Sequence, residues 1–200
     1  MLLLDCKQRS TEWDDMRLGI PTASEYHKIV TTKGEPSEQR QKYLYELVGE
    51  RLTGRPTDRF ASYKMKKATE REPTVRVFYE LLYDIEVQEI GFIYGEGLRY
   101  GYSPDGLIGK NGLIELKDAE PHVQAMRLDK GWKGREHFQQ IQGGLFCSKR
   151  EWCDLVSFCE AMKPIIIRYE RDEAFITKLE AELVAFCDRL EEVTERLRAL

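Results

Sequence analysis

The sequence predicts an α/β fold in which a central mixed β-sheet is flanked by helices on both faces. Apolar residues recur at helical spacing in the first half of the chain and again at its end. Between them lie stretches rich in β-branched and aromatic residues, which are typical of strands. The chain has 200 residues, and this length suits a single domain spanning residues 1–200.

Three helices are expected in the first half. Thr22 and Glu25 match a capping box, in which each side chain satisfies a free backbone N–H at the start of a short helix. A second helix should end at Gly54, and a third should carry Pro73 in its first turn or at a kink. The apolar positions of the last two are Leu44, Leu47, Val48 and Leu52, then Val75, Phe78, Tyr79 and Leu82.

The middle of the chain is predicted to form strands joined by tight turns. Asn111-Gly112 is the strongest short hairpin signal, and it precedes a strand. Gly95-Glu96-Gly97 separates two earlier strands. The expected strands cover 86–94, 97–102, 112–117, 151–159 and 164–169, with a helix over about 135–147.

The final segment predicts a helix with a heptad-like apolar stripe. Such a stripe fits either a helix laid on the core or a contact between subunits, and the core is favoured because three to four heptads are not reached. The stripe consists of Leu179, Leu183, Phe186, Leu190, Val193 and Leu197.

Composition points to a cytoplasmic protein that is not inserted in a membrane. No apolar run approaches the roughly 20 residues needed to cross a bilayer, and the three leucines near the start are too few for a signal peptide. The 5 cysteines are expected to be reduced thiols. Net charge is −4, yet residues 51–76 hold eight basic and three acidic residues. This stretch is either a stripe that binds phosphates or a solvated helix face.

Three ionisable side chains are expected to meet at the hairpin. Asp105 ends one strand or follows it, whereas Glu115 and Lys117 lie on the next strand and point to the same side. Two carboxylates in close contact repel each other unless a cation lies between them, and oxygen ligands suit Mg²⁺ or Mn²⁺. Such an ion polarises a phosphoryl group and activates water, and Lys117 would orient or deprotonate that water. The pattern favours phosphodiester hydrolysis.

Several motifs, in order, resemble the phage lambda exonuclease (YqaJ-type recombinase) family of the PD-(D/E)xK nuclease superfamily. The resemblance runs from about residue 10 to 180. His137 is a departure, because the family usually has Tyr there. The motifs are STEWDDMRLGIPTASE (10–25), MKKATEREP (65–73), YSPDG (102–106), ELK (115–117), HFQQIQ (137–142) and YERDEAF (169–175).

This resemblance implies roles for matching residues. Asp105, Glu115 and the backbone carbonyl of Leu116 would bind metal, expected as two Mg²⁺ ions with Mn²⁺ as an alternative. Lys117 would act on the attacking water, and Glu72 would complete the acidic cluster. Met65 falls where relatives carry a wedge that parts the terminal base pair, although a core methionine is an equal alternative. The 5′-phosphate pocket would consist of Arg17, Ser24, Ser103 and Gln140.

The implied protein is a PD-(D/E)xK nuclease of α/β fold that degrades double-stranded DNA 5′→3′ from 5′-phosphorylated ends. It would release mononucleotides, leave 3′ single strands for recombination, and work as a ring-shaped homotrimer beside a single-strand annealing protein. Two alternatives stay open: an endonuclease of the same superfamily directed at junctions or sites, and a non-catalytic module that binds DNA ends.

Overall fold

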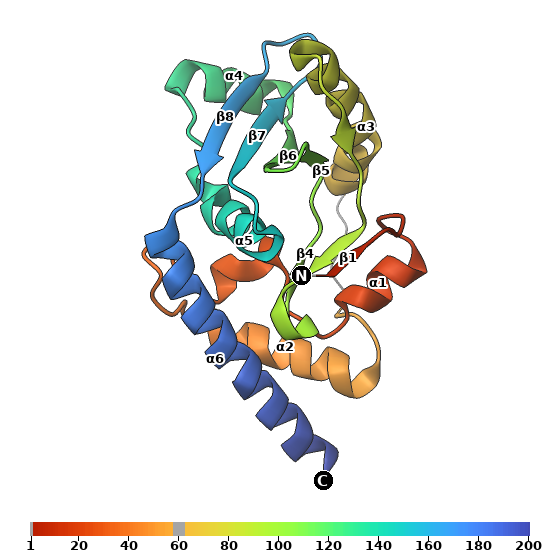
Figure 1. The fold of residues 1–200 in the computed structure, drawn as a ribbon, viewed down its shortest axis with the longest axis vertical. Coiled ribbons are helices and arrows are strands. Elements are labelled where there is room, and N and C mark those ends of the chain that lie inside the picture. The colour runs from red at the N-terminus through yellow and green to blue at the C-terminus, as the bar shows by residue number, and fades with distance from the viewer. Residues whose placement is uncertain (1, 58–62) are drawn as a thin grey trace.

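The computed structural model describes residues 2–57 and 63–200, and within these all side chains except those of 63–70 and 96. Its centre is a five-stranded sheet of order β2-β5-β6-β7-β8 (Figure 1). Only β6 and β7 run parallel, so the sheet is mixed, as expected. The strands are β2 (Val87–Gln88), β5 (Gly106–Ile108), β6 (Gly112–Asp118), β7 (Trp152–Phe158) and β8 (Ile165–Glu170).

A second sheet of three strands has the order β1-β3-β4, formed by Leu2–Leu4, Phe92–Tyr94 and Gly101–Tyr102. The prediction of a single strand over 86–94 was therefore wrong, whereas the strand predicted over 97–102 is present only at its end, as β4. The chain leaves the large sheet after β2, and the N–H of Gly91 then donates to the carbonyl of Leu4 at 3.3 Å. A side chain at Gly91 would collide with Cys6, so glycine is required where the two segments meet. The short helix η2 (Glu96–Leu98) joins β3 to β4.

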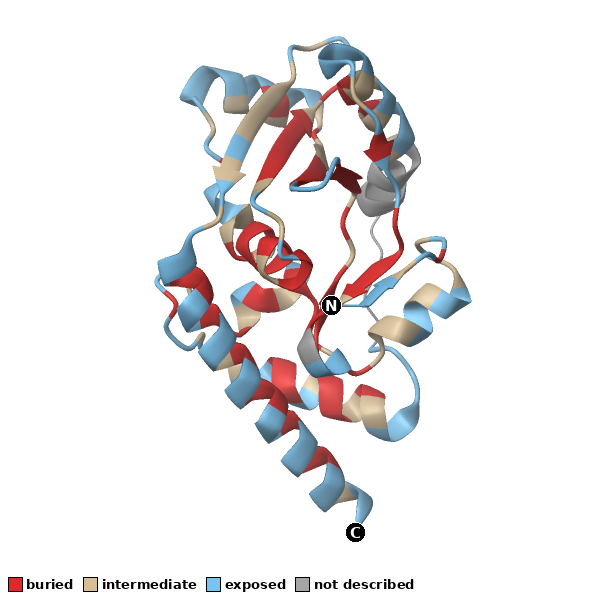
Figure 2. Ribbon diagram, viewed as in Figure 1, coloured by how far each residue is buried: buried red, intermediate tan, exposed pale blue. Residues whose placement is uncertain are grey.

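Helices cover both faces of the large sheet. On one face, α3 (Tyr63–Tyr83) packs Val75 and Tyr79 against Ile114 and Leu116 of β6. On the other, α5 (Phe138–Ser148) belongs to the larger apolar cluster and is mostly buried, as are β6 and β7 (Figure 2). Two further elements precede α5: helix α4 (Pro121–Lys130) and the short η3 (Arg135–His137).

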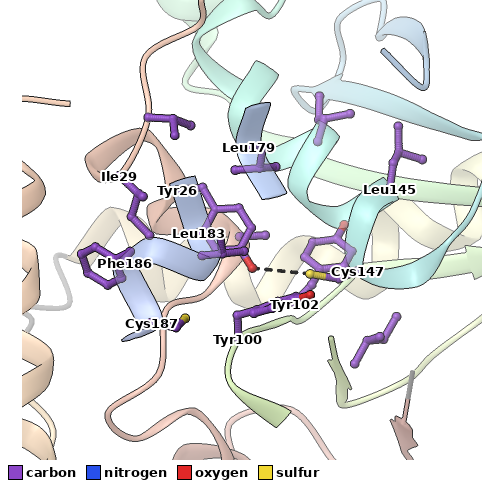
Figure 3. Close-up of a cluster of buried hydrophobic side chains, with 14 of the residues drawn as sticks. Tyr26, Ile29, Tyr100, Tyr102, Leu145, Cys147, Leu179, Leu183, Phe186 and Cys187 are labelled. Carbon is purple, nitrogen blue, oxygen red and sulfur yellow. Dashed lines mark hydrogen bonds between the residues drawn. The ribbon is translucent and has the colours of Figure 1, made fainter. Parts of the chain in front are cut away.

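The larger core lies where the N-terminal helices, α5 and the C-terminal helix meet. The N-terminal elements are α1 (Thr11–Arg17), η1 (Ala23–Lys28) and α2 (Arg40–Thr53), and the last helix is α6 (Glu173–Arg198). Figure 3 shows Tyr26 pointing toward Cys147, with Leu179, Leu183 and Phe186 of α6 beside it. The apolar stripe of α6 thus packs within its own chain, as the core interpretation predicted.

The capping box predicted at Thr22 and Glu25 was wrong, and two other local expectations are met in a different form. Thr22 makes no capping bond through its side chain, because η1 is a 3-10 helix and Glu25 pairs with Lys28 instead. Pro73 lies in the interior of α3 and not in its first turn, and the alternative of a kink there stays a prediction. Proline inside a helix costs about 3 kcal/mol, and burial of Val75 and Tyr79 nearby opposes that cost. The hairpin predicted at Asn111-Gly112 is confirmed between β5 and β6, and Gly109, at φ +49°, is the left-handed residue of its turn.

The remaining expectations concern cysteines, charge and membrane. All five cysteines are free and buried. Part of the basic stretch 51–76 lies outside the described residues, and Arg51, Arg71 and Arg76 contact their own chain. Among the helices that the structure describes, none has the length and apolar character to cross a bilayer.

Candidate active site

The β5–β6 hairpin brings Asp105 and Glu115 to the same face of the sheet. Gly106 pairs with Ile114, and extending this antiparallel register by one residue places Asp105 opposite Glu115. The carboxylate of Asp105 also accepts a hydrogen bond from the backbone N–H of Leu116 at 2.7 Å. The convergence predicted from the hairpin is therefore present.

Glu115 is the centre of a buried hydrogen-bond network. Its side chain is 3% exposed, and its two oxygens are bound from three directions. Tyr102 donates its hydroxyl to Oε2 at 2.9 Å, whereas Lys117 donates to Oε1 at 2.7 Å. The amide of Gln140 also donates to Oε1, and its oxygen accepts from Lys117 at 3.3 Å. A buried carboxylate with this many donors is fixed in orientation.

Burial and neighbouring charges act differently on the pKa values of Asp105 and Lys117. Burial raises the pKa of Asp105 well above its usual range, and the charges of Glu115 and Glu72 raise it further, against the opposing effect of Lys117. Burial lowers the pKa of Lys117, but Glu115 and Asp105 outweigh it and the net shift is upward. Lys117 is therefore a cation at neutral pH. In this state it can orient water and stabilise negative charge.

Glu72 reaches the site from α3. It is bound by Arg9 through two contacts, from Nη1 to Oε2 at 3.1 Å and from Nη2 to Oε1 at 2.7 Å. One helical turn later, Arg76 donates to the backbone carbonyl of Asp105 at 3.1 Å. Within residues 2–57 and 63–200, no three His, Cys, Asp or Glu side chains form a cluster shaped to hold a metal ion.

The residues assigned to a phosphate pocket fall into two places. Arg17 stacks on Trp13 at 3.8 Å, and Trp13 donates to the hydroxyl of Ser103 at 2.9 Å. Arg17 also lines a cavity of about 300 Å³ with Thr22, whose hydroxyl lies 3.3 Å from that of Ser24. Gln140, in contrast, is bound to the carboxylate network. Met65 belongs to α3, but its side chain lies outside the described part of the chain.

Three residues that contact the site carboxylates or their backbone were not identified from the sequence. Tyr102 and Arg9 bind Glu115 and Glu72 directly, and Arg76 binds the backbone of Asp105. Tyr102 could have been noticed, because it stands directly before the Ser-Pro-Asp segment on the strand leading to Asp105. Arg9 could not, since 63 residues separate it from Glu72.

Comparison with known proteins identifies the family. The model of the YqaJ-like viral recombinase domain matches residues 12–151, which include the hairpin, Glu72 and Gln140. The chain belongs to the YqaJ-like viral recombinase family. This agrees with the resemblance carried by the sequence motifs.

Solved structures of exonucleases extend the match. An alkaline exonuclease from Laribacter hongkongensis superposes with a TM-score of 0.84 at 34% identity, covering 95% of this chain and 97% of that one. The same enzyme in complex with dAMP matches equally well. A phage-related exonuclease from Haemophilus somnus has a TM-score of 0.67 at 14% identity, covering 89% and 96%, and shares the fold. No curated protein sequence matches the chain.

The donor set fits a hard divalent cation. Asp105 is partly exposed, and Glu115 lies opposite it in the hairpin register. Two carboxylates with a backbone carbonyl are oxygen ligands of the kind that Mg²⁺ binds while keeping several waters. The raised pKa of Asp105 shows that the site favours additional positive charge. Asp105, Glu115 and the carbonyl of Leu116 are the residues that would hold the ion.

Proposed function

We propose that this protein is a Mg²⁺-dependent exonuclease that degrades double-stranded DNA 5′→3′ from its ends. The observation that carries the proposal is the hairpin cluster of Asp105, Glu115 and Lys117 in a chain of this family. The 34% identical relative is an alkaline exonuclease, and its complex with dAMP supports mononucleotides as products.

Different residues would serve different roles in hydrolysis. Asp105, Glu115 and the Leu116 carbonyl would hold Mg²⁺, with Mn²⁺ as a substitute, and a bound ion of this kind supplies an activated water and polarises the phosphoryl group. Lys117, fixed between Glu115 and Gln140, orients the attacking water and offsets charge in the transition state. Arg17, with its planar guanidinium, would bind the 5′-phosphate beside Ser103 and Ser24.

The test is a time course on DNA of defined ends. A linear duplex with 5′-phosphates should release mononucleotides with Mg²⁺ and stay intact with EDTA, and a closed circular plasmid should be spared. A label on the 5′ end should be released first. Cutting of the circle would indicate an endonuclease, and metal-independent binding without release would indicate a DNA-end-binding module. Either result contradicts the proposal.

Lys117→Ala should abolish turnover while binding of DNA ends persists, because it removes a cation used at the reacting atoms. Lys149→Ala is the matched control, since this exposed lysine follows the far end of α5. The proposal also includes a ring-shaped homotrimer, which light scattering can test, and a single-strand annealing protein as partner.

A further inference from the structure

Arg9 adopts a backbone conformation that long side chains rarely take. It lies in the turn of residues 7–10, which is closed by a hydrogen bond from the N–H of Ser10 to the carbonyl of Lys7 at 3.1 Å. Its φ is +66°, in the left-handed region that favours glycine. Residues held in such conformations gather at functional sites, where the surrounding structure enforces them.

Within the described part of the chain, the side chain of Arg9 binds Glu72. Both terminal nitrogens engage both carboxylate oxygens, at 3.1 and 2.7 Å. A two-point contact between planar groups fixes the plane and rotation of the carboxylate, which a single contact does not. The Arg9 side chain is 46% exposed and that of Glu72 is 21% exposed, so the pair lies at the open rim of the site.

Glu72 lies on the face of α3 that meets the hairpin. Arg76, one turn further along α3, contacts the Asp105 carbonyl, and this shows that the same helix face meets the hairpin. Arg9 therefore fixes the carboxylate of Glu72 on the helix face beside the hairpin that carries Asp105 and Glu115.

Neighbouring residues already anchor the turn without Arg9. The side-chain amide of Gln8 donates to the carbonyls of Ile90 at 2.9 Å and Pro104 at 2.7 Å. Ser10 caps α1 by accepting from the N–H of Trp13. Glycine would adopt the conformation of residue 9 more easily than arginine does. Structural support alone does not account for an arginine at this position.

We propose that Arg9 is a positioning residue that orients Glu72 toward the metal-binding carboxylates, and so sets the Mg²⁺ requirement of the enzyme. This inference rests on the proposed function. Removing a group that orients a metal site from outside its ligands typically changes metal affinity or activity 10- to 100-fold. Arg9 would belong to this class, acting through Glu72 rather than on DNA.

The decisive variant is Arg9→Gly, because glycine suits the backbone and removes only the side chain. Its melting temperature without metal should match that of the wild type, since relief of the left-handed conformation opposes the greater freedom of glycine in the unfolded chain. The Mg²⁺ concentration for half-maximal digestion should rise about tenfold, and the Mg²⁺-induced increase in melting temperature should shrink. Arg9→Lys, which keeps the charge but not the two-point contact, should show most of this effect.

Two comparisons make the test specific. Lys149→Gly is the matched control, because Lys149 is also a cationic residue at positive φ (+55°), and it should leave the Mg²⁺ requirement unchanged. In a Glu72→Gln background, adding Arg9→Gly should cause no further loss. A further tenfold loss there, an unchanged or lower Mg²⁺ requirement in Arg9→Gly, or a fall in its metal-free melting temperature that parallels its activity would overturn the inference.

The outcome also separates this inference from the function on which it rests. If the wild type gains thermal stability with Mg²⁺ but releases no nucleotides, the exonuclease proposal fails. The comparison of Mg²⁺-induced stabilisation between wild type and Arg9→Gly then still decides the role of Arg9. If Mg²⁺ neither stabilises the wild type nor supports digestion, both proposals are overturned.

Discussion

Replacing His137 should make the protein less sensitive to acid. The ring of His137 lies at the start of α5, with its side chain 20% exposed. Burial lowers its pKa from 6.5 to about 4, and the nearby charges of Lys117 and Arg127 act in the same direction, against Glu136. Within the described structure, Nε2 is buried without a hydrogen-bond partner, since Glu136 is 3.8 Å away. The folded chain therefore holds a neutral ring.

The direction of the pH effect on stability depends on whether the folded or the unfolded chain binds the proton more readily. Below pH 6.5 the unfolded chain protonates this histidine, whereas the folded chain does so only near pH 4. Acid therefore favours unfolding over the window from about 6.5 down to 4, and above 6.5 the effect is absent. Each unit of difference in pKa corresponds to about 1.36 kcal/mol. The loss of unfolding free energy is about 2 kcal/mol at pH 5 and about 3 kcal/mol below pH 4.

Urea denaturation with EDTA present, at pH 7.5 and pH 5, measures this contribution. His137→Gln cannot take up the proton, so its stability should fall about 2 kcal/mol less than that of the wild type between the two pH values. The contributions of other titrating groups to this change are shared by both proteins, so they cancel when the variant is compared with the wild type. His122→Gln, at an exposed position, should follow the wild type. Equal pH dependence of wild type and His137→Gln would refute the assignment of a buried neutral ring.

Three further substitutions test the packing around the site. Tyr102→Phe keeps the ring but removes the donor to buried Glu115, and should lower the unfolding free energy by about 2 kcal/mol in urea denaturation. Gly134→Ala should cost about 2 kcal/mol in the same assay, because φ is +65° and the new Cβ would lie 2.2 Å from Leu155. Asp154→Asn weakens a buried carboxylate's bonds to Tyr79 and Arg168 on the opposite face, so it should cost about 2 kcal/mol yet leave kcat unchanged.

The chemistry of the hairpin was predictable because it is local. Asp105 and Lys117 are separated by a single turn, and strand alternation decides which side chains share a face. The heptad-like stripe of α6 was predictable for a similar reason, since a long periodic pattern has one buried side. Both inferences needed only the short-range geometry of the backbone.

Contacts between distant segments were not predictable in this way. The splitting of 86–94 into two sheets depends on where Leu2–Leu4 pairs, and three-residue strands carry too little pattern to reveal it. Helix α4 was overlooked, although Pro121 at its first turn and Gly131 as its C-cap are recognised signals. The apolar stripe that marks other helices is weak there, since Met126 and Leu128 are exposed.

The role of Lys117 shows most clearly what the sequence alone leaves open. A lysine beside a metal site can serve as a base or as a cation, and the choice depends on how burial competes with neighbouring charge. Here two carboxylates outweigh burial, so Lys117 stays charged. Lys117 pairs with Glu115, and Arg9 pairs with Glu72, so each cation offsets one carboxylate of the site. Burial and the charge of Glu115 still raise the pKa of Asp105, so the negative charge at the hairpin is not fully offset before a metal ion binds.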